Sequence, residues 1–341
     1  MRNLIIALGV TTAMVAPAAA ENLSVVGSWS GLPLHKQYEA PFWSETLPGK
    51  ADVTVELTTH NQMGLGLGDI YPLLGQGVYD VAMTVADYAV SDAPELEGLD
   101  VPMMAATADE ARVMVDAARG MVDDIYANRF NAKVLAIAPY PPQVVFCNAE
   151  IAGLDDLKGL KVRASGRMTA KFLEALGAEG INVSFSEVPG ALQKGVVDCA
   201  VTGAGSGYSA GWWEVSTHLL PIPLGGWDHV VTAMNMDKWN GLDGGTQEAI
   251  MASIKADFED PAWASAQGAL VNDIACLTGN GECPAGDARG MTLVEASETD
   301  IARASEILKA EVLPEWAERA GPEWTARWND TVGKAVGVTI E

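Results

Sequence analysis

The sequence predicts an α/β protein of two lobes, each a mixed, mostly parallel sheet flanked by helices, with one long packing helix. Residues 155–203 have the order strand, helix, strand, short helix and strand, at a spacing typical of parallel sheets. The run Tyr140-Pro141-Pro142 interrupts an earlier β/α alternation, which favours a chain crossing between two lobes. Residues 298–316 place Ile301, Ala304, Leu308 and Val312 on one helical face.

The first half of the chain alternates strands and helices. Strands are predicted at 23–28, 53–57, 81–84 and 133–138, and helices at 35–43, 69–74 and 108–129. Thr107 and Glu110 form a capping box at the start of the longest of these helices. This order places the loops that follow the strands, including the loop after Ser28, at a ligand-facing sheet edge.

The second half begins with a strand at 144–147. The central stretch then predicts a strand ending at Arg163, a helix at 168–176, a strand to Phe185, a helix at 189–194 and a strand at 196–201. A glycine-rich loop at 203–207, a helix at 209–218, a second crossing at 220–226, a strand at 230–235 and a helix at 247–258 follow. We therefore expect lobe I at 21–143 and about 229–270, lobe II at 144–228 and about 271–320, and a C-terminal tail at 321–341 that packs on the lobes.

The N-terminus predicts export. Residues 1–20 carry a basic start at Arg2, an apolar run at 4–15 and the small residues Ala18-Ala19-Ala20, the pattern of a cleaved signal peptide. We expect a periplasmic protein that starts at Glu21. The formal charge of −24 argues against nucleic acid or an anionic membrane surface as a partner, because anionic partners attract basic surfaces. After the signal peptide, no stretch reaches spanning length without charges or Gly/Pro breaks, so we expect no direct membrane insertion.

An exported chain with four cysteines suggests disulfides. Cys276 and Cys283 flank a short Gly/Asn-rich loop, so we predict a bridge between them. Cys147 and Cys199 lie on predicted strands, and the sequence leaves open whether they pair or stay buried thiols. The spacing of cysteines and histidines does not match a metal site, so we expect no metal and no cofactor.

The central stretch carries three phrases in order: D-L-K-G-L-K-V-R, F-S-E-V and A-L-Q-K-G-V-V-D. This combination resembles the TRAP-type solute-binding proteins, the periplasmic receptors of tripartite ATP-independent transporters. The resemblance implies the periplasmic binding protein fold, a small organic-acid ligand, and partnership with small and large integral membrane subunits. It implies ligand binding without catalysis.

Arg163 ends a strand just before Ala164-Ser165-Gly166 opens a helix. A guanidinium there can hold a ligand carboxylate with two parallel hydrogen bonds. The resemblance implies that Arg163 is the fixed carboxylate anchor and that Phe185 packs against the ligand.

Two positions depart from the family pattern in ways that make the pocket less polar. Thr202 stands where relatives carry asparagine, and Gln143 stands where some relatives carry a second arginine. Pro189 also replaces a usual tyrosine. We therefore expect a monocarboxylate with an apolar or aromatic body, with a C4-dicarboxylate or sugar acid as the alternative.

Three further residues are candidates for the cleft. Trp29 and Tyr140 lie in loops predicted to face the cleft, and flat rings suit a flat ligand. His60 either lines the cleft or lies in a solvated loop. Two other functions stay open: the binding protein of an ATP-driven importer, and a secreted esterase, although the sequence lacks the Gly-x-Ser-x-Gly nucleophile motif that an esterase would use.

Overall fold

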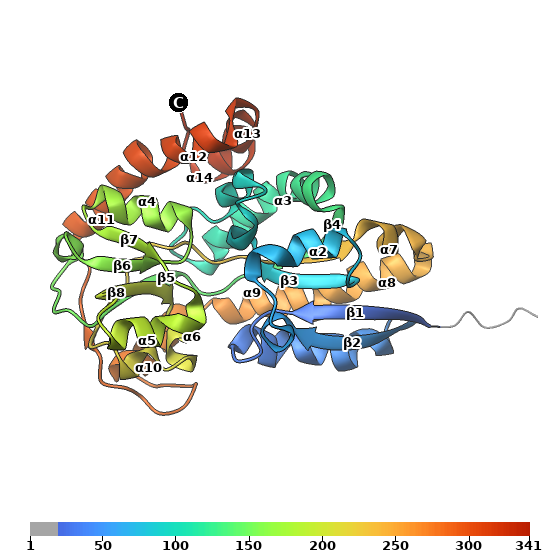
Figure 1. Cartoon of the computed structure of the whole chain (residues 1–341), viewed down its shortest axis with the longest axis horizontal. Helices are drawn as coiled ribbons and strands as arrows, with labels where there is room; N and C mark the ends of the chain where they lie inside the picture. The colour runs from blue at the N-terminus through green and yellow to red at the C-terminus, as the bar shows by residue number, and fades with distance from the viewer. Residues whose placement is uncertain (1–19) are drawn as a thin grey trace, which may run out of the picture.

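The computed structural model describes residues 20–341 and contains two mixed sheets flanked by helices (Figure 1). The predicted signal peptide at 1–20 lies outside the described residues except for its last one. The two sheets confirm the predicted two-lobed binding-protein fold, while the division into residue ranges stays a prediction. No helix among residues 20–341 is both long and apolar enough to cross a bilayer.

Sheet A is five-stranded, in the order β2-β1-β3-β10-β4. Its strands are β1 (Glu21–Gly27), β2 (Val53–Thr59), β3 (Val81–Val85), β4 (Ala132–Ala138) and β10 (Val230–Asn235). Strand β1 is parallel to β2 and β3, and β10 is antiparallel to β3 and β4. The insertion of β10 between β3 and β4 returns the chain to this sheet after it has built five strands of the other sheet.

Sheet B is six-stranded, in the order β11-β9-β5-β8-β6-β7. Its strands are β5 (Gln143–Cys147), β6 (Lys161–Ala164), β7 (Glu179–Asn182), β8 (Cys199–Gly203), β9 (His218–Leu220) and β11 (Thr292–Leu293). Strand β5 is antiparallel to β8 and β9, whereas β6 is parallel to β7 and β8. The chain passes from sheet A to sheet B at Pro139–Pro142, between β4 and β5.

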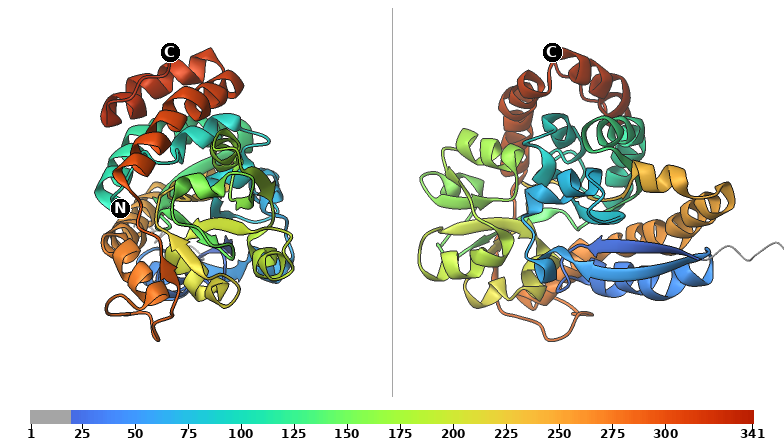
Figure 2. Two further views of the ribbon diagram at one scale, coloured as in Figure 1. Left: turned by 90° about the vertical axis from the view of Figure 1, so that its left-hand side faces the viewer. Right: turned by 45° about the vertical axis from the view of Figure 1, so that its right-hand side comes forward.

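Helices cover both sheets (Figures 1 and 2). The label η marks 3₁₀ and π segments. The helices between or beside the strands of sheet A are η1 (His35–Glu39), η2 (Phe42–Thr46), η3 (Leu47–Gly49), α1 (His60–Met63), η4 (Leu67–Asp69), α2 (Ile70–Gly75), η5 (Ala86–Ala89), η6 (Pro94–Leu99), α3 (Ala108–Phe130), α7 (Met236–Gly241), α8 (Gly244–Ile254), η10 (Lys255–Glu259) and α9 (Asp260–Ala266). Those of sheet B are η7 (Leu154–Leu157), α4 (Arg167–Ala175), η8 (Phe185–Glu187), α5 (Val188–Gln193), α6 (Ala204–Ser209), η9 (Trp212–Glu214) and α10 (Ala269–Thr278). The predicted capping box of Thr107 and Glu110 opens α3.

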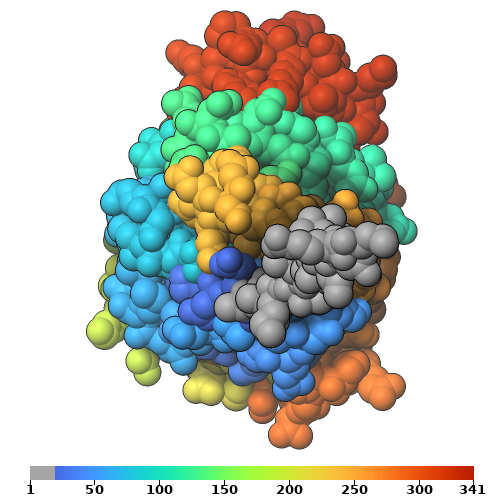
Figure 3. Space-filling view, turned by 90° about the vertical axis from the view of Figure 1, so that its right-hand side faces the viewer, coloured from blue at the N-terminus to red at the C-terminus, as the bar shows by residue number. Residues whose placement is uncertain are grey.

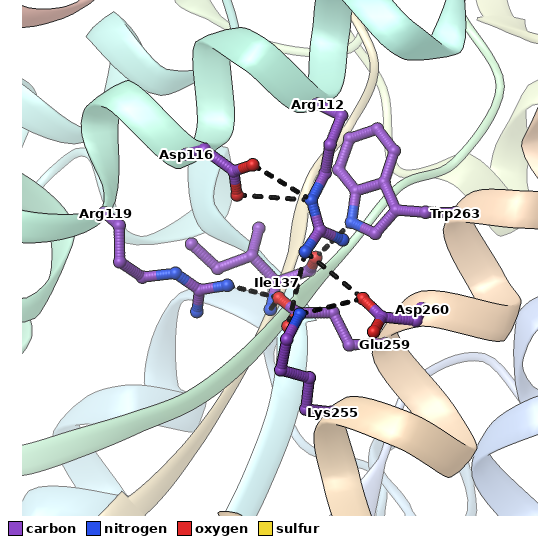
Figure 4. A network of polar contacts seen from close by, with 8 residues as sticks. All are labelled: Arg112, Asp116, Arg119, Ile137, Lys255, Glu259, Asp260 and Trp263. Carbon is purple, nitrogen blue, oxygen red and sulfur yellow. Dashed lines mark hydrogen bonds and ion pairs between the residues drawn. The ribbon is translucent and has the colours of Figure 1, made fainter. Parts of the chain in front are cut away.

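A polar network holds α9 and the preceding η10 against α3 and the edge strand β4 (Figure 4). Glu259 is buried, accepts a hydrogen bond from Ile137 N at 2.9 Å and pairs with Arg119. Trp263 Nε1 donates to Ile137 O at 2.8 Å, and the Arg112 guanidinium lies over the Trp263 ring. These contacts satisfy backbone groups of β4 that have no strand beyond them.

The C-terminal helices extend across both lobes. Segments α11 (Glu298–Ile307), η11 (Leu308–Val312) and α12 (Leu313–Ala320) follow one another without a break, and α13 (Pro322–Trp328), η12 (Asn329–Gly333) and α14 (Lys334–Val336) complete the chain. Figures 2 and 3 show the C-terminal end of this run over α3. Segments α13, η12 and α14 contact α3, whereas η11 contacts α4. Trp316 and Trp328 are fully buried and donate to the carbonyls of Pro94 and Gly98.

The structure corrects several predicted elements. Residues 204–209 form the helix α6 instead of a loop, and residues 209–218 contain only the short η9 before β9. Strand β7 ends at Asn182, so Phe185 begins a 3₁₀ turn. The predicted Cys276–Cys283 disulfide is confirmed, and Cys147 pairs with Cys199, its register partner across β5 and β8.

Candidate ligand-binding site

Two neighbouring cavities lie where the strand ends of the two sheets face each other. The smaller one is lined by Trp29, Leu32, Val85, Tyr88, Tyr140, Arg163, Phe185, Thr202, Ser206 and Asp228. The larger one, of about 800 Å³, shares four of these residues and extends past His60 and Asp87 to the start of α4. The shared residues are Trp29, Tyr88, Arg163 and Phe185. We treat the two cavities as parts of one cleft between the lobes.

Arg163 lies at the centre of this cleft because it is the next-to-last residue of β6 and lines both cavities. Its side chain is 2% exposed. Nε donates to Val183 O at 3.0 Å and Nη1 donates to Val201 O at 2.6 Å. These two carbonyls fix the guanidinium, while Nη2 has no hydrogen-bond partner among the described residues. A rigidly held donor with free hydrogens is suited to a carboxylate or another acceptor.

Aromatic rings surround the guanidinium. Trp29 follows β1 and lies within 6.5 Å, centroid to centroid, of the rings of Tyr88, Tyr140 and Phe185. Burial raises the pKa of Tyr88 to about 12 and that of Tyr140 well above its usual range, so both hydroxyls stay protonated and can donate or accept. The cleft wall is therefore largely apolar, built of rings tilted by 48–69° relative to Trp29, and it carries the hydroxyl groups of Tyr88 and Tyr140.

Two predicted contact residues have different positions. Thr202, near the end of β8, is 3% exposed and lines the smaller cavity. Gln143 is fully buried and does not line either cavity. Its Nε2 donates to Gly225 O and to Asp228 Oδ1, the latter at 2.9 Å, so it holds a cleft residue in place.

His60 begins α1 and lines the larger cavity, in edge contact with Trp29 at 4.8 Å between ring centroids. Its side chain is buried, which excludes the solvated-loop alternative. Burial lowers the pKa of His60 to about 4, so the ring is neutral at pH 7. It adds a polar edge but no positive charge.

The sequence analysis missed two carboxylates in the cleft, Asp87 and Asp228. Asp87 follows β3 within η5, and Asp228 lies in the loop between β9 and β10. Burial, together with neighbouring carboxylates such as Asp100, raises the pKa of both well above the usual range. No motif marks these residues. Asp87 follows the strand predicted at 81–84 by three positions and Asp228 precedes the strand predicted at 230–235 by two, and this closeness to a strand end is the one signal that could have found them.

Residues 38–267 match the profile of bacterial extracellular solute-binding protein, family 7. The chain belongs to this family. The predicted TRAP-type solute-binding protein is thereby confirmed.

Across residues 20–341 we find no group of three or more His, Cys, Asp or Glu side chains arranged to hold a metal ion.

Individual relatives are distant in sequence but close in fold. The uncharacterized protein YiiZ of Salmonella typhimurium is 27% identical over 225 residues, which cover 62% of this chain and 66% of YiiZ, just under two thirds of that relative. DctP7, a Bordetella pertussis extracytoplasmic solute receptor binding pyroglutamic acid, has a TM-score of 0.80 at 19% identity, covering 92% of this chain and 99% of DctP7.

The ectoine-binding protein of the TeaABC TRAP transporter of Halomonas elongata has a TM-score of 0.79 at 19% identity, covering 93% of this chain and 99% of that one. Other structures of the same fold hold malonate or orotic acid. The shared fold alone therefore does not select one ligand.

Proposed function

We propose that this protein is the periplasmic solute receptor of a TRAP transporter and binds a small organic acid whose carboxylate pairs with Arg163. The observation that supports this most is a buried guanidinium that lines the cleft and is held by backbone carbonyls. Among the described side chains it has no ion-pair partner within 4.0 Å. A buried cation without a counter-ion favours an anionic ligand.

The ligand's body is proposed to be apolar or aromatic. The rings of Trp29, Tyr88, Tyr140 and Phe185 form much of the wall of the smaller cavity. Thr202 contributes one hydroxyl and a methyl group to it. A flat monocarboxylate would bury its body against these surfaces while its acid group meets Arg163.

We further propose that ligand binding closes the cleft and that the TRAP membrane subunits recognise the closed form. The cleft draws on residues of both sheets: Trp29 and Asp87 follow strands of sheet A, whereas Arg163 and Thr202 belong to sheet B. A ligand that contacts both groups shifts the population toward closure only if it binds the closed state more tightly.

A C4-dicarboxylate or sugar acid is the second candidate, because a solved structure of the same fold holds another dicarboxylate, the three-carbon malonate. In this chain the second acid group would need a donor, and the hydroxyls of Tyr88, Tyr140 and Thr202 are available in the smaller cavity. Competition between monocarboxylates and dicarboxylates of equal length separates the two candidates.

The test is a thermal-shift screen of the mature protein against small organic acids, with Arg163→Gln alongside. A ligand that binds only the folded state raises the melting temperature by mass action. We expect a monocarboxylate to stabilise the wild type and to bind Arg163→Gln at least about 100-fold more weakly, since breaking a buried charged contact costs about 3 kcal/mol or more. Arg303→Gln removes a surface ion pair with Asp155 and is the matched control. Equal binding to Arg163→Gln would contradict the anchor.

A further inference from the structure

Opposite charges line the same small cavity without pairing with each other. Arg163 and Asp228 both line it, yet no ion pair of 4.0 Å or less joins them. Asp228 Oδ1 accepts a hydrogen bond from Gln143 Nε2 at 2.9 Å, while Oδ2 has no partner among the described side chains. The cavity therefore presents a free donor and a free carboxylate oxygen at the same time.

The position of Asp228 is fixed by its surroundings. Its backbone is left-handed, with φ of 44°, and its N–H donates to Asp100 Oδ2 at 2.8 Å. Asp100 also accepts from Trp227 N, so the whole turn is tied to a buried carboxylate. A side chain held this way is a built part of the wall. Burial and Asp100 raise its pKa and Arg163 opposes that shift, but no ion pair of 4.0 Å or less joins Arg163 to Asp228. A positively charged ligand group beside Asp228 would favour the ionised form of this acid.

A second acidic side chain in the cleft, Asp87, also has a carboxyl oxygen without a hydrogen-bond partner. Asp87 lines the larger cavity, and its Oδ1 is buried without a hydrogen bond. A Cβ added to Gly166 would lie 2.4 Å from Asp87 Oδ2, so this carboxylate from sheet A reaches the start of α4 beside sheet B. The cleft thus holds the carboxyl groups of Asp87 and Asp228, and Asp228 shares the smaller cavity with Arg163.

Neither Arg167 nor His60 supplies a cation that pairs with Asp228. Arg167 also lines the larger cavity, but it pairs with Glu315 at 2.9 Å on the outer side. His60 is neutral at pH 7, as described above. The faces of the Trp29, Tyr88 and Tyr140 rings attract cations through their quadrupoles. Charge and ring surface together favour a positive group beside the ligand carboxylate.

We infer that the ligand is a zwitterion, whose carboxylate pairs with Arg163 and whose positively charged nitrogen lies near Asp228 inside the aromatic wall. This inference rests on the proposed function, since it needs Arg163 as the anchor. It narrows the ligand class from acids in general to amino, imino or betaine-type acids. A ligand cation in this place favours the ionised form of Asp228, whereas a second carboxylate would favour its neutral form and gain no ion pair.

Calorimetric titration of the mature protein with isosteric pairs tests the inference on the wild type. Three pairs keep shape and exchange the charged nitrogen for carbon: glycine betaine with 3,3-dimethylbutanoate, 4-aminobutanoate with pentanoate, and L-proline with cyclopentanecarboxylate. Malonate and succinate represent dicarboxylates. We expect at least one zwitterion to bind, and its carbon isostere to bind about 30-fold more weakly or worse, as for loss of one buried charge partner.

Asp228→Asn repeats the test from the protein side. Asparagine tolerates the left-handed backbone and can still accept from Gln143, so the fold should persist, and circular dichroism checks this. We expect the affinity of this variant for the zwitterion to fall about 30-fold, and its affinity for the carbon isostere to change little. Asp92→Asn, on an exposed side chain, is the matched control and should bind as the wild type does.

The outcomes separate the two proposals. Binding confined to acids without a positive nitrogen, equal binding of both members of each pair, or no binding of any zwitterion would overturn the zwitterion inference. The zwitterion inference would also be overturned if Asp228→Asn kept the wild-type preference for the zwitterion. If Arg163→Gln lost binding in the same experiment, the carboxylate anchor would still stand. Zwitterion binding that survives Arg163→Gln would instead overturn the anchor.

Discussion

His60 is a buried base that makes folding depend on pH. Its Nε2 is buried and has no hydrogen-bond partner. Its pKa in the folded protein is about 4, against 6.5 for the ordinary side chain. Between these values the unfolded chain binds more protons, so the free energy of unfolding rises with pH from 4 to 6.5 and the full contribution is present above 6.5.

We predict that His60→Gln reduces the loss of stability between pH 6.5 and pH 4 by about 2 kcal/mol relative to wild type. Urea unfolding followed by circular dichroism at several pH values measures it. Asn61→Gln changes the neighbouring exposed residue and should keep the wild-type pH profile. The same slope in His60→Gln and wild type would show that His60 is solvated in the folded protein.

At the residue scale, sequence patterns identified the residues that have a motif or follow a recognisable strand. Arg163, Trp29, Tyr140, Phe185 and Thr202 all line one cavity, as their positions after or within predicted strands suggest. Sequence patterns did not identify the contact between Gln143 and Asp228, because these residues are 85 positions apart and are joined by a hydrogen bond that only the folded chain forms. A pair that forms only when two crossings lie side by side leaves no local pattern to read.

At the scale of one element, the helix α6 shows why a glycine-rich run can be wrongly predicted as a loop. The run Gly203–Gly207 suggests a loop because glycine disfavours helices. In the structure, a Cβ on Gly207 would lie 2.4 Å from the Phe146 ring, so glycine is needed for α6 to pack against β5. Tertiary packing therefore overrides local propensity here, and only the position of Phe146 reveals it.

The contact between Gly207 and Phe146 predicts that alanine at position 207 lowers stability, opposite to what helix propensity alone would give. Gly207→Ala should destabilise the protein by about 1–3 kcal/mol through overpacking, despite the better helix propensity of alanine. Gly190→Ala, in α5 with nothing within 4 Å of the new Cβ, should be neutral or stabilise by up to about 1 kcal/mol. Chemical unfolding of the two variants measures the contrast. A stabilising Gly207→Ala would show that α6 lies farther from β5.

At the scale of the whole molecule, a chain of charges connects the two lobes through the C-terminal helix. Glu97 in η6, on the sheet A side, pairs with Arg319 of α12. Arg319 also bonds Glu315 at 3.1 Å, and Glu315 pairs with Arg167 of α4 at 2.9 Å on the sheet B side. The sequence predicted the fold class because β/α alternation is local, but this connection requires residues more than 200 positions apart.

Glu97 decides how much this network contributes to stability. It is 1% exposed, and burial raises its pKa while Arg319 opposes that shift. Arg319→Met would leave this acid buried without its cation, so we predict a loss of about 3–5 kcal/mol in the free energy of unfolding. Arg303→Met breaks the exposed pair with Asp155 and should cost less than about 1 kcal/mol.

A double variant distinguishes the pair from the packing around it. Replacing both Glu97 and Arg319 by methionine removes the unpaired charge, so much of the stability lost in Arg319→Met should return. Urea unfolding of the single and double variants supplies the comparison. If the double variant is as unstable as Arg319→Met, the C-terminal helix is held to the lobes by the packing of its arginine stem and of Trp316 rather than by charge.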